Sequence, residues 1–175
     1  MNHIVLVHPA IPQNTGNIMR TCVATHSKLH LIKPLGFSLD DKHMKRAGLD
    51  YIKDLEMEIY ENWEDFVSKN QGDYHFFTRY SKLCYSDQSY VSDNDQYIIF
   101  GHEHDGIPHD ILKKYLDQCV RIPMDSGARS LNLSNCVAIG IYEVLRQQNY
   151  PGFIKSRGTK RCKILSIKNR KSDIF

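Results

Sequence analysis

Amide and guanidinium side chains recur at a spacing of three after the first apolar run of the chain. Asn14, Asn17 and Arg20 follow the run at residues 4–7 and a short segment that contains two prolines. A helix that begins near residue 14 places such side chains on one face. Two carboxamides and a guanidinium on one face can hold a phosphate, a ribose or a carboxylate. A capped helix with an exposed polar stripe explains the same spacing, and this motif alone slightly favours that interpretation.

A second polar segment, GHEHDG at residues 101–106, follows the apolar run at residues 98–100. Its bounding glycines allow a backbone to approach a ligand closely. The segment is neither a G-x-G-x-x-G nor a P-loop motif. His102, Glu103 and His104 raise the alternative of a metal site, but no H-E-x-x-H helix accompanies them. We therefore expect a ligand loop that holds no metal.

The third segment, residues 122–135, joins an apolar run to the longest helical pattern in the chain. Ser130, Asn132, Ser134 and Asn135 provide more neutral hydrogen-bonding groups than a helix cap requires. Together with the free backbone amides at a helix start, they suit an adenosine or a carboxylate better than a bulk phosphate. This segment is the strongest indication of a binding site.

Short apolar runs and helical patterns alternate along the whole chain. Strands are expected at residues 4–7, 29–32, 56–60, 74–78, 96–100 and 119–122. Helices are expected at residues 14–25, from residue 40 or 41 to 46, at 63–68, 111–116 and 132–148. The alternation predicts an α/β fold whose ligands bind beyond the carboxyl ends of parallel strands. Each of the three polar segments follows such a strand.

The composition describes one globular domain. The chain has 175 residues, of which 41% are hydrophobic and 25% charged. No apolar stretch reaches the roughly 18 residues of a membrane span, and the first residues lack the pattern of a signal peptide. The five cysteines are scattered without a C-x-x-C pair, which favours buried free thiols over disulfides or a zinc site. We therefore expect a cytoplasmic protein without a membrane partner.

Positive charge is concentrated near the C-terminus. Residues 155–175 contain eight Lys or Arg and one Asp, a net charge of +7, so residues 1–154 carry a net charge of −4. This divides the chain into a mildly acidic domain and a basic tail, which favours contact with a polyanion such as nucleic acid. A solvated terminus explains the charge of the tail equally well.

The three segments together resemble a known family. N-T-G-N-I-M-R at 14–20, I-F-G-H-E-H-D-G-I-P at 99–108 and the I-P-M…S-L-N-L-S-N segment at 122–135 resemble the three motifs of the SPOUT superfamily of RNA methyltransferases. Within it they resemble the SpoU-type ribose 2'-O-methyltransferases. Residues 36–42 and 46–51 are similar to the small single-domain TrmL-type branch, which methylates the wobble nucleotide of tRNA. The resemblance covers residues 3 to about 153.

The resemblance implies a SPOUT fold, in which a parallel sheet lies between helices and the C-terminal part forms a trefoil knot. Such a knot is an exception to the rule that chains are unknotted. The implied methyl donor is S-adenosylmethionine, bound between the second and third motifs. The family also implies a homodimer that shares its site between subunits and binds the anticodon stem-loop of tRNA. By analogy the donor pocket comprises Phe77, Thr78, Gly101, Gly106, Ile122, Ser130, Leu131 and Leu133.

The implied reaction methylates the ribose 2'-hydroxyl of cytidine or 5-carboxymethylaminomethyluridine at position 34. A sulfonium methyl group is already electrophilic, so the reaction requires no metal. The family assigns activation of the hydroxyl to the arginine that matches Arg20, with Asn14 and Asn17 orienting it and Glu103 contacting Arg20 or the substrate. A guanidinium hardly deprotonates, so a substrate phosphate could share the proton while Arg20 stabilises the alkoxide.

Three further residues are assigned to substrate binding or the subunit interface. These are Arg129, Asn135, which would order the knot loop, and Tyr142 on the last helix.

Two departures from the family pattern have consequences. The second motif commonly reads F-G-P-E-T/S-R-G-L-P, whereas this chain has His102, His104 and Asp105 at the varied positions. The loss of an arginine and gain of an aspartate predict altered RNA affinity or substrate choice. The basic tail extends beyond the usual end of such chains, and we expect it to contact phosphates of the anticodon arm.

The residues leave three alternatives to wobble methylation open. The chain could methylate another tRNA or rRNA position, or it could bind RNA without catalysis. It could also be a metal-dependent phosphoesterase that uses His102, Glu103 and His104.

Overall fold

The structure is a computed structural model that describes residues 1–38 and 52–155. The helix expected from residue 40 or 41 to 46 and the stretch 46–51 lie outside the described residues. The basic tail also lies outside them, apart from Lys155.

Six parallel strands form one sheet in the order β3-β2-β1-β5-β4-β6. The strands are β1 (Asn2–Val7), β2 (Lys28–Ile32), β3 (Met57–Tyr60), β4 (Asp73–Phe77), β5 (Gln96–Phe100) and β6 (Cys119–Val120). The pairing of β1 with both β2 and β5 places the first motif beside the second at the carboxyl edge of the sheet. The prediction of an α/β fold with a parallel sheet is confirmed, and every expected strand is present.

The last strand is shorter than expected because the chain leaves β4 after Val120. The Arg121 N–H donates to the carbonyl of Leu83, and the Arg121 carbonyl accepts from the Tyr85 N–H, both at 2.9 Å. Residues 119–121 are therefore held between β4 and the long connection that follows it. The end of the last helix also contacts this connection, since Gln147 Nε2 donates to the Gln88 carbonyl at 2.9 Å.

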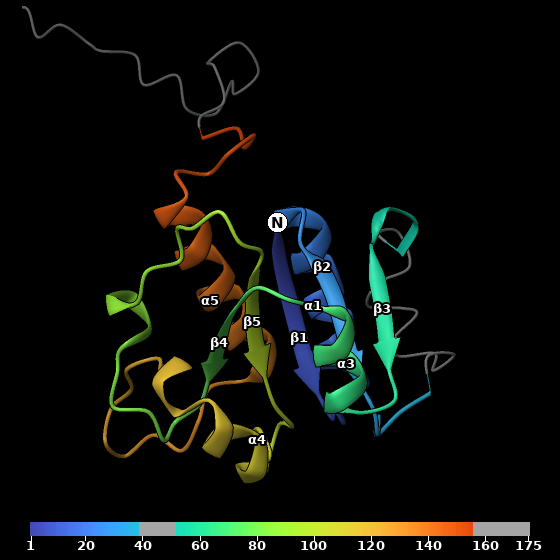
Figure 1. Ribbon diagram of the computed structural model, residues 1–175, viewed down its shortest axis with the longest axis vertical. Coiled ribbons are helices and arrows are strands. Elements are labelled where there is room, and N and C mark those ends of the chain that lie inside the picture. The colour runs from blue at the N-terminus through green and yellow to red at the C-terminus, as the bar shows by residue number, and fades with distance from the viewer. Residues whose placement is uncertain (39–51, 156–175) are drawn as a thin grey trace, which may run out of the picture.

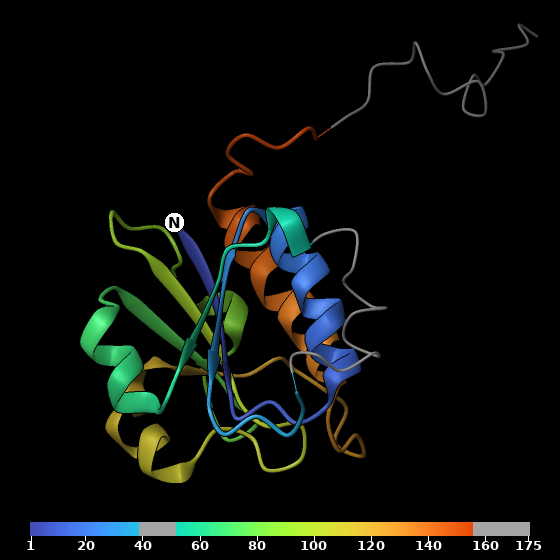
Figure 2. The same ribbon diagram turned by 90° about the vertical axis from the view of Figure 1, so that its right-hand side faces the viewer.

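Within the described residues, four α-helices lie on the two faces of the sheet, as can be followed in Figure 2. They are α1 (Pro12–Thr25), α3 (Trp63–Lys69), α4 (His109–Lys114) and α5 (Leu133–Gln147). Short 3-10 turns occupy Ile52–Asp54, Tyr85–Asp87 and Leu116–Gln118. The helix expected at 111–116 begins two residues earlier and ends before Tyr115.

Both ends of α5 follow from local chemistry. Asn132 is the N-cap, since its side-chain oxygen accepts from the Ser134 N–H at 2.9 Å. At the other end, Asn149 and Tyr150 have φ values of 61° and 52°. This left-handed backbone ends the helix before the Pro-Gly pair at 151–152, which was the expected terminator.

The strands carry apolar side chains on both faces, as a buried parallel sheet requires. Ile4 and Leu6 of β1 pack with Ile18 of α1 and Ile141 of α5 on one face. Val5 and other side chains of the opposite face pack against α3 and α4 through Trp63, Phe66, Ile111 and Leu112. Figures 1 and 2 show the two layers of helices and the sheet between them. The rigid sheet fixes the loops at its carboxyl edge.

A polar cluster is buried beneath α3, on the opposite face from α1. His3 Nδ1 lies 2.9 Å from His30 Nε2, and His30 Nδ1 lies 3.0 Å from the Tyr60 hydroxyl. Asn70 Nδ2 donates to the same hydroxyl at 3.1 Å, and Tyr60 donates to Glu58. Burial, with the nearby His3 and Lys28, lowers the pKa of His30 to about 3. We refer to His3, His30, Tyr60 and Asn70 as the histidine cluster.

The described cysteines are free. Cys22 and Cys119 are buried, while Cys84 and Cys136 are only half-buried, so the prediction of buried thiols holds for two of the four. Burial raises the pKa of Cys22. Within residues 1–38 and 52–155, no helix has the length and apolar character to cross a membrane.

Candidate functional site

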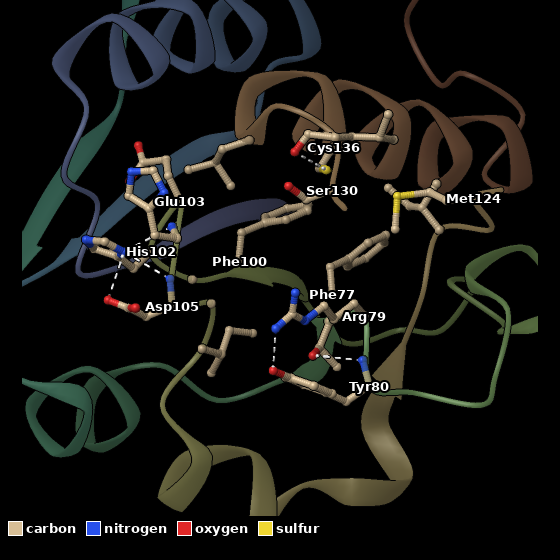
Figure 3. A pocket seen from close by; sticks show the side chains of 18 residues that line it. Phe77, Arg79, Tyr80, Phe100, His102, Glu103, Asp105, Met124, Ser130 and Cys136 are labelled. Atoms are coloured by element: carbon tan, nitrogen blue, oxygen red, sulfur yellow. Dashed lines mark hydrogen bonds and ion pairs between the residues drawn. The ribbon is translucent and has the colours of Figure 1, made fainter. Parts of the chain in front are cut away.

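A cavity of about 160 Å³ opens at the carboxyl ends of β4, β5 and β6. We refer to it as the edge pocket (Figure 3). Its wall comes from three stretches that are far apart in sequence and that the parallel strands bring to one edge: residues 77–80, residues 100–107 and scattered positions from 122 to 136. A ligand site at this edge is what the parallel arrangement predicts.

All eight residues assigned to the donor pocket line this cavity. They are Phe77, Thr78, Gly101, Gly106, Ile122, Ser130, Leu131 and Leu133. Phe77 is buried, and its ring centroid lies 4.8 Å from that of Phe100, so the two rings form an apolar wall. Gly140 of α5 has no side chain, and this allows α5 to approach the wall closely. An ideal Cβ at Gly140 would lie only 3.0 Å from Phe77.

The second motif forms a tight turn at one side of the pocket. The His102 N–H donates to the Gly106 carbonyl at 3.1 Å, and the Gly106 N–H returns to the His102 carbonyl at 2.9 Å. Gly106 has a φ of 74°, a conformation that favours glycine. A Cβ on Gly101 would lie 2.1 Å from the Gly106 carbon and the Ile107 nitrogen. Both glycines are therefore required by the backbone of the turn.

His102 stabilises the same turn. Its Nδ1 accepts from the backbone N–H groups of His104 at 3.1 Å and Asp105 at 3.2 Å. The residue that replaces the usual proline of the second motif thus contributes turn hydrogen bonds through its side chain.

Glu103 binds the start of α1. Oε2 accepts from the Ala10 N–H at 2.9 Å, and Oε1 accepts from the Ile11 N–H and from Asn14 Nδ2, both at 3.1 Å. Ile11 at the N-cap has no side-chain acceptor of its own, and the negative carboxylate suits the positive end of a helix. Both carboxylate oxygens therefore bind residues between Ala10 and Asn14, and a contact of Glu103 with Arg20 or the substrate stays a prediction.

Asn14 extends this connection to the third motif. Its Oδ1 accepts from Asn132 Nδ2 at 2.9 Å, while its Nδ2 donates to Glu103. Asn132 in turn caps α5. Hydrogen bonds therefore join all three motifs directly. Asn132 therefore orders the start of α5, and the assignment of Asn135 to ordering the knot loop stays a prediction.

Asn14, Asn17 and Arg20 do not share one environment. Asn14 is buried, whereas Asn17 and Arg20 are exposed. Each step of three residues rotates the side-chain direction by about 60° around a helix of 3.6 residues per turn, so the first and last of the three point in different directions. The described wall of the edge pocket contains none of the three.

Three other assigned residues are exposed and lie outside the described pocket wall. Arg129 and Asn135 lie just before and within the first turn of α5. Tyr142, also on α5, is 50% exposed. They are available to a second chain or to a large ligand.

Several wall residues were not expected from the sequence. Arg79 and Tyr80 directly follow Phe77 and Thr78 at the end of β4, and Met124 and Cys136 complete the side nearest α5. The signal that could have identified Arg79 and Tyr80 is their position immediately beyond the carboxyl end of a parallel strand.

The geometry does not favour a metal site in the second motif. Within residues 1–38 and 52–155, no group of three His, Cys, Asp or Glu side chains is arranged to hold a metal ion. The Glu103 oxygens are engaged by Ala10, Ile11 and Asn14, and His102 Nδ1 accepts two backbone N–H groups. The phosphoesterase alternative therefore lacks its ligand set.

Comparison with known proteins places the chain in a family. Residues 1–142 match the SpoU rRNA Methylase family. A candidate tRNA (cytidine(34)-2'-O)-methyltransferase of Listeria monocytogenes is 49% identical over 156 residues, covering 88% of this chain and 92% of the relative. The tRNA (cytidine(34)-2'-O)-methyltransferase of Burkholderia ambifaria is 44% identical over 157 residues, covering 87% of this chain and 99% of the relative.

A solved structure described as giving insight into 2-OH methylation of C/U34 on tRNA is similar in fold as well as in sequence. It is 34% identical with a TM-score of 0.80, and the match covers 85% of this chain and 97% of the other. The order of the motifs, the edge pocket and these similarities all point to the same family. The chain belongs to the SpoU rRNA Methylase family.

Proposed function

We propose that this protein methylates the ribose 2'-hydroxyl of the wobble nucleotide of tRNA, using S-adenosylmethionine as the methyl donor. The nucleotide is cytidine or 5-carboxymethylaminomethyluridine at position 34. The observation that carries the proposal is that all eight residues assigned to donor binding line one pocket at the carboxyl edge of the sheet. The names of the Listeria and Burkholderia relatives support the choice of substrate.

The wall of the edge pocket fits the proposed donor. An adenosine needs an apolar slot with backbone and hydroxyl partners, which Phe77, Leu131, Leu133 and Ser130 can provide. Gly101 and Gly106 bring main-chain groups to the same wall. When bound, a sulfonium donor supplies an electrophilic methyl group.

In this proposal the protein positions the 2'-hydroxyl and assists the loss of its proton. Arg20 would orient the hydroxyl and stabilise the developing alkoxide, with Asn17 one turn away on α1. Glu103 and Asn14 hold the first turn of α1 against the pocket loops. We assign them to the placement of Arg20.

A homodimer belongs to the same proposal. Arg20 is absent from the described wall of the edge pocket, so a second copy of the chain that supplies its own Arg20 could complete the site. Tyr142 and Asn135 present an exposed polar and aromatic surface on α5 for such an interface. The anticodon stem-loop would then lie across both subunits, where the exposed Arg129 could contact it.

We also infer the trefoil knot and a cytoplasmic location. The clamping of Arg121 between Leu83 and Tyr85, together with the contact from Gln147 to Gln88, supports a chain that threads past the connection after β4. The free described thiols support a reducing compartment.

Transfer of labelled methyl from S-adenosylmethionine to bulk tRNA, followed by nuclease mapping, tests the proposal. We expect label in a 2'-O-methyl nucleotide at the wobble position and a loss of at least about 100-fold in rate for Arg20→Ala. Lys113→Ala on α4 is the matched control, because it removes an exposed cation that lies outside the three motifs and outside the described pocket wall, and it should retain activity. Label at another nucleotide would reject the substrate, and no transfer to any RNA would reject the reaction.

A further inference from the structure

Arg79 is the one lysine or arginine in the described wall of the edge pocket. It directly follows Phe77 and Thr78, at the point where β4 ends. Figure 3 shows its guanidinium pointing toward the middle of the pocket, with Tyr80 beside it. The rest of the wall is apolar or uncharged except for the second motif, where Glu103 is bound to the start of α1.

Tyr80 holds the guanidinium in place. Arg79 Nη2 donates to the Tyr80 hydroxyl at 2.8 Å, and Arg79 Cζ lies 4.9 Å from the Tyr80 ring centroid. The other edge of this ring contacts His109 of α4, with centroids 5.7 Å apart and planes at 83°. Both side chains are exposed, and these contacts orient the guanidinium.

No acidic side chain of the described residues pairs with Arg79; Tyr80 is its hydrogen-bond partner there. Asp105 on the same wall lies beside His102, with Oδ2 at 3.3 Å from Nδ1. A guanidinium has five N–H donors, and one of them accounts for the bond to Tyr80. The remaining donors can form paired hydrogen bonds with the two oxygens of a carboxylate or phosphate.

We propose that Arg79, oriented by Tyr80, is the oxyanion-binding residue of the edge pocket. The inference rests on the proposed function, which supplies two sources of such an oxyanion. One is the carboxylate of the donor's amino-acid group, and the other is a phosphate beside the nucleotide that is methylated. Arg79 binds through a planar pair of N–H groups, so lysine would replace it poorly.

Calorimetric titration with two nucleosides separates the sources. S-adenosylhomocysteine carries the amino-acid carboxylate, whereas 5'-methylthioadenosine lacks it. If Arg79 binds that carboxylate, Arg79→Gln weakens binding of S-adenosylhomocysteine by about tenfold and leaves 5'-methylthioadenosine unchanged. Tyr80→Phe, which removes the orienting hydroxyl, produces a smaller loss for the first ligand alone.

Titration with tRNA tests the second source. If Arg79 binds a phosphate, both nucleosides bind Arg79→Gln as they bind the wild type. Affinity for tRNA then falls by about tenfold, and the dependence of log affinity on log salt concentration becomes shallower by about one unit. Lys82→Ala is the control, because Lys82 is exposed in the same connection but absent from the pocket wall.

An Arg79→Gln protein that is folded by circular dichroism and binds both nucleosides and tRNA like the wild type overturns the inference. Failure of the wild type to bind either nucleoside overturns the proposed function instead. The two failures are therefore distinguishable.

Discussion

The edge pocket and the histidine cluster are two polar regions on the same sheet, and they differ in whether they are buried or open to a ligand. In the histidine cluster, His3, His30 and Tyr60 bond to one another and their rings lie close together, at 5.1 Å for His3 and His30. In the edge pocket, Arg79 points toward an open cavity, and its wall also contains Ser130. The first region is closed and structural, while the second is open to a ligand.

The difference shows that residue type is a poor guide to function without its surroundings. Histidine is a frequent catalytic residue. Yet His30 is fully buried, with hydrogen bonds to His3 and Tyr60. The site that we assign to catalysis depends instead on glycines, amides and arginines, in loops and on α1, that follow the strands.

The largest effect on stability is expected from the link between the edge pocket and α1. Glu103→Ala leaves the Ala10 and Ile11 N–H groups and Asn14 Nδ2 without their acceptor. We expect a loss of about 3 kcal/mol of stability in urea unfolding and a drop of at least about tenfold in methyl transfer. Glu64→Ala on the exposed side of α3 is the control. If Glu103→Ala kept full stability and activity, the carboxylate would not join the motifs.

Acidification should weaken the histidine cluster. The pKa of His30 is lowered from 6.5 to about 3 in the folded protein, so the unfolded chain binds more protons between these values. Its stabilising contribution is present above pH 6.5 and is lost as the pH falls toward 3. From His30 alone, we expect the free energy of unfolding to fall by about 2 kcal/mol between pH 6.5 and 5. Urea unfolding at each pH measures this change.

His30→Gln should flatten this pH dependence, because glutamine does not titrate in that range. Donor binding at pH 7.5 should be unaffected by the same change. An equally steep dependence in His30→Gln would show that other groups control acid stability.

The smallest effect concerns substrate contacts beyond the edge pocket. Residues 156–175 contain seven Lys or Arg. Their deletion should weaken tRNA binding by about tenfold, or about 1.4 kcal/mol, and reduce its salt dependence, since each phosphate contact releases counterions. Filter binding over a range of salt concentrations measures both quantities. Unchanged affinity and slope would mean that the tail is a solvated terminus.

The sheet could be predicted from the sequence because buried parallel strands leave short apolar runs such as residues 4–7 and 98–100. Six donor residues were assigned through the second and third motifs, and Phe77 and Thr78 through the family resemblance; the structure places all eight on one wall. The strands are features local in sequence, whereas the donor residues depend on the resemblance to a known family.

The contacts between motifs could not be predicted in the same way. Glu103 binds Ala10 across 93 residues, and Asn132 binds Asn14 across 118, so spacing within a motif contains no sign of either bond. The inward direction of Asn14 depends on how α1 docks on the sheet. Arg79 belongs to none of the three motifs and becomes visible only when β4 is placed beside β5.

The most direct test of the central claim is binding of S-adenosylhomocysteine to the wild type and to Gly101→Ala, measured by calorimetry. A Cβ at position 101 would lie 2.1 Å from the backbone of Gly106 and Ile107, so it must displace the wall of the edge pocket. Tyr60→Phe in the histidine cluster serves as the control. We predict that the wild type and Tyr60→Phe bind the ligand and that folded Gly101→Ala does not. Equal binding by folded Gly101→Ala would contradict the assignment of the edge pocket as the donor site.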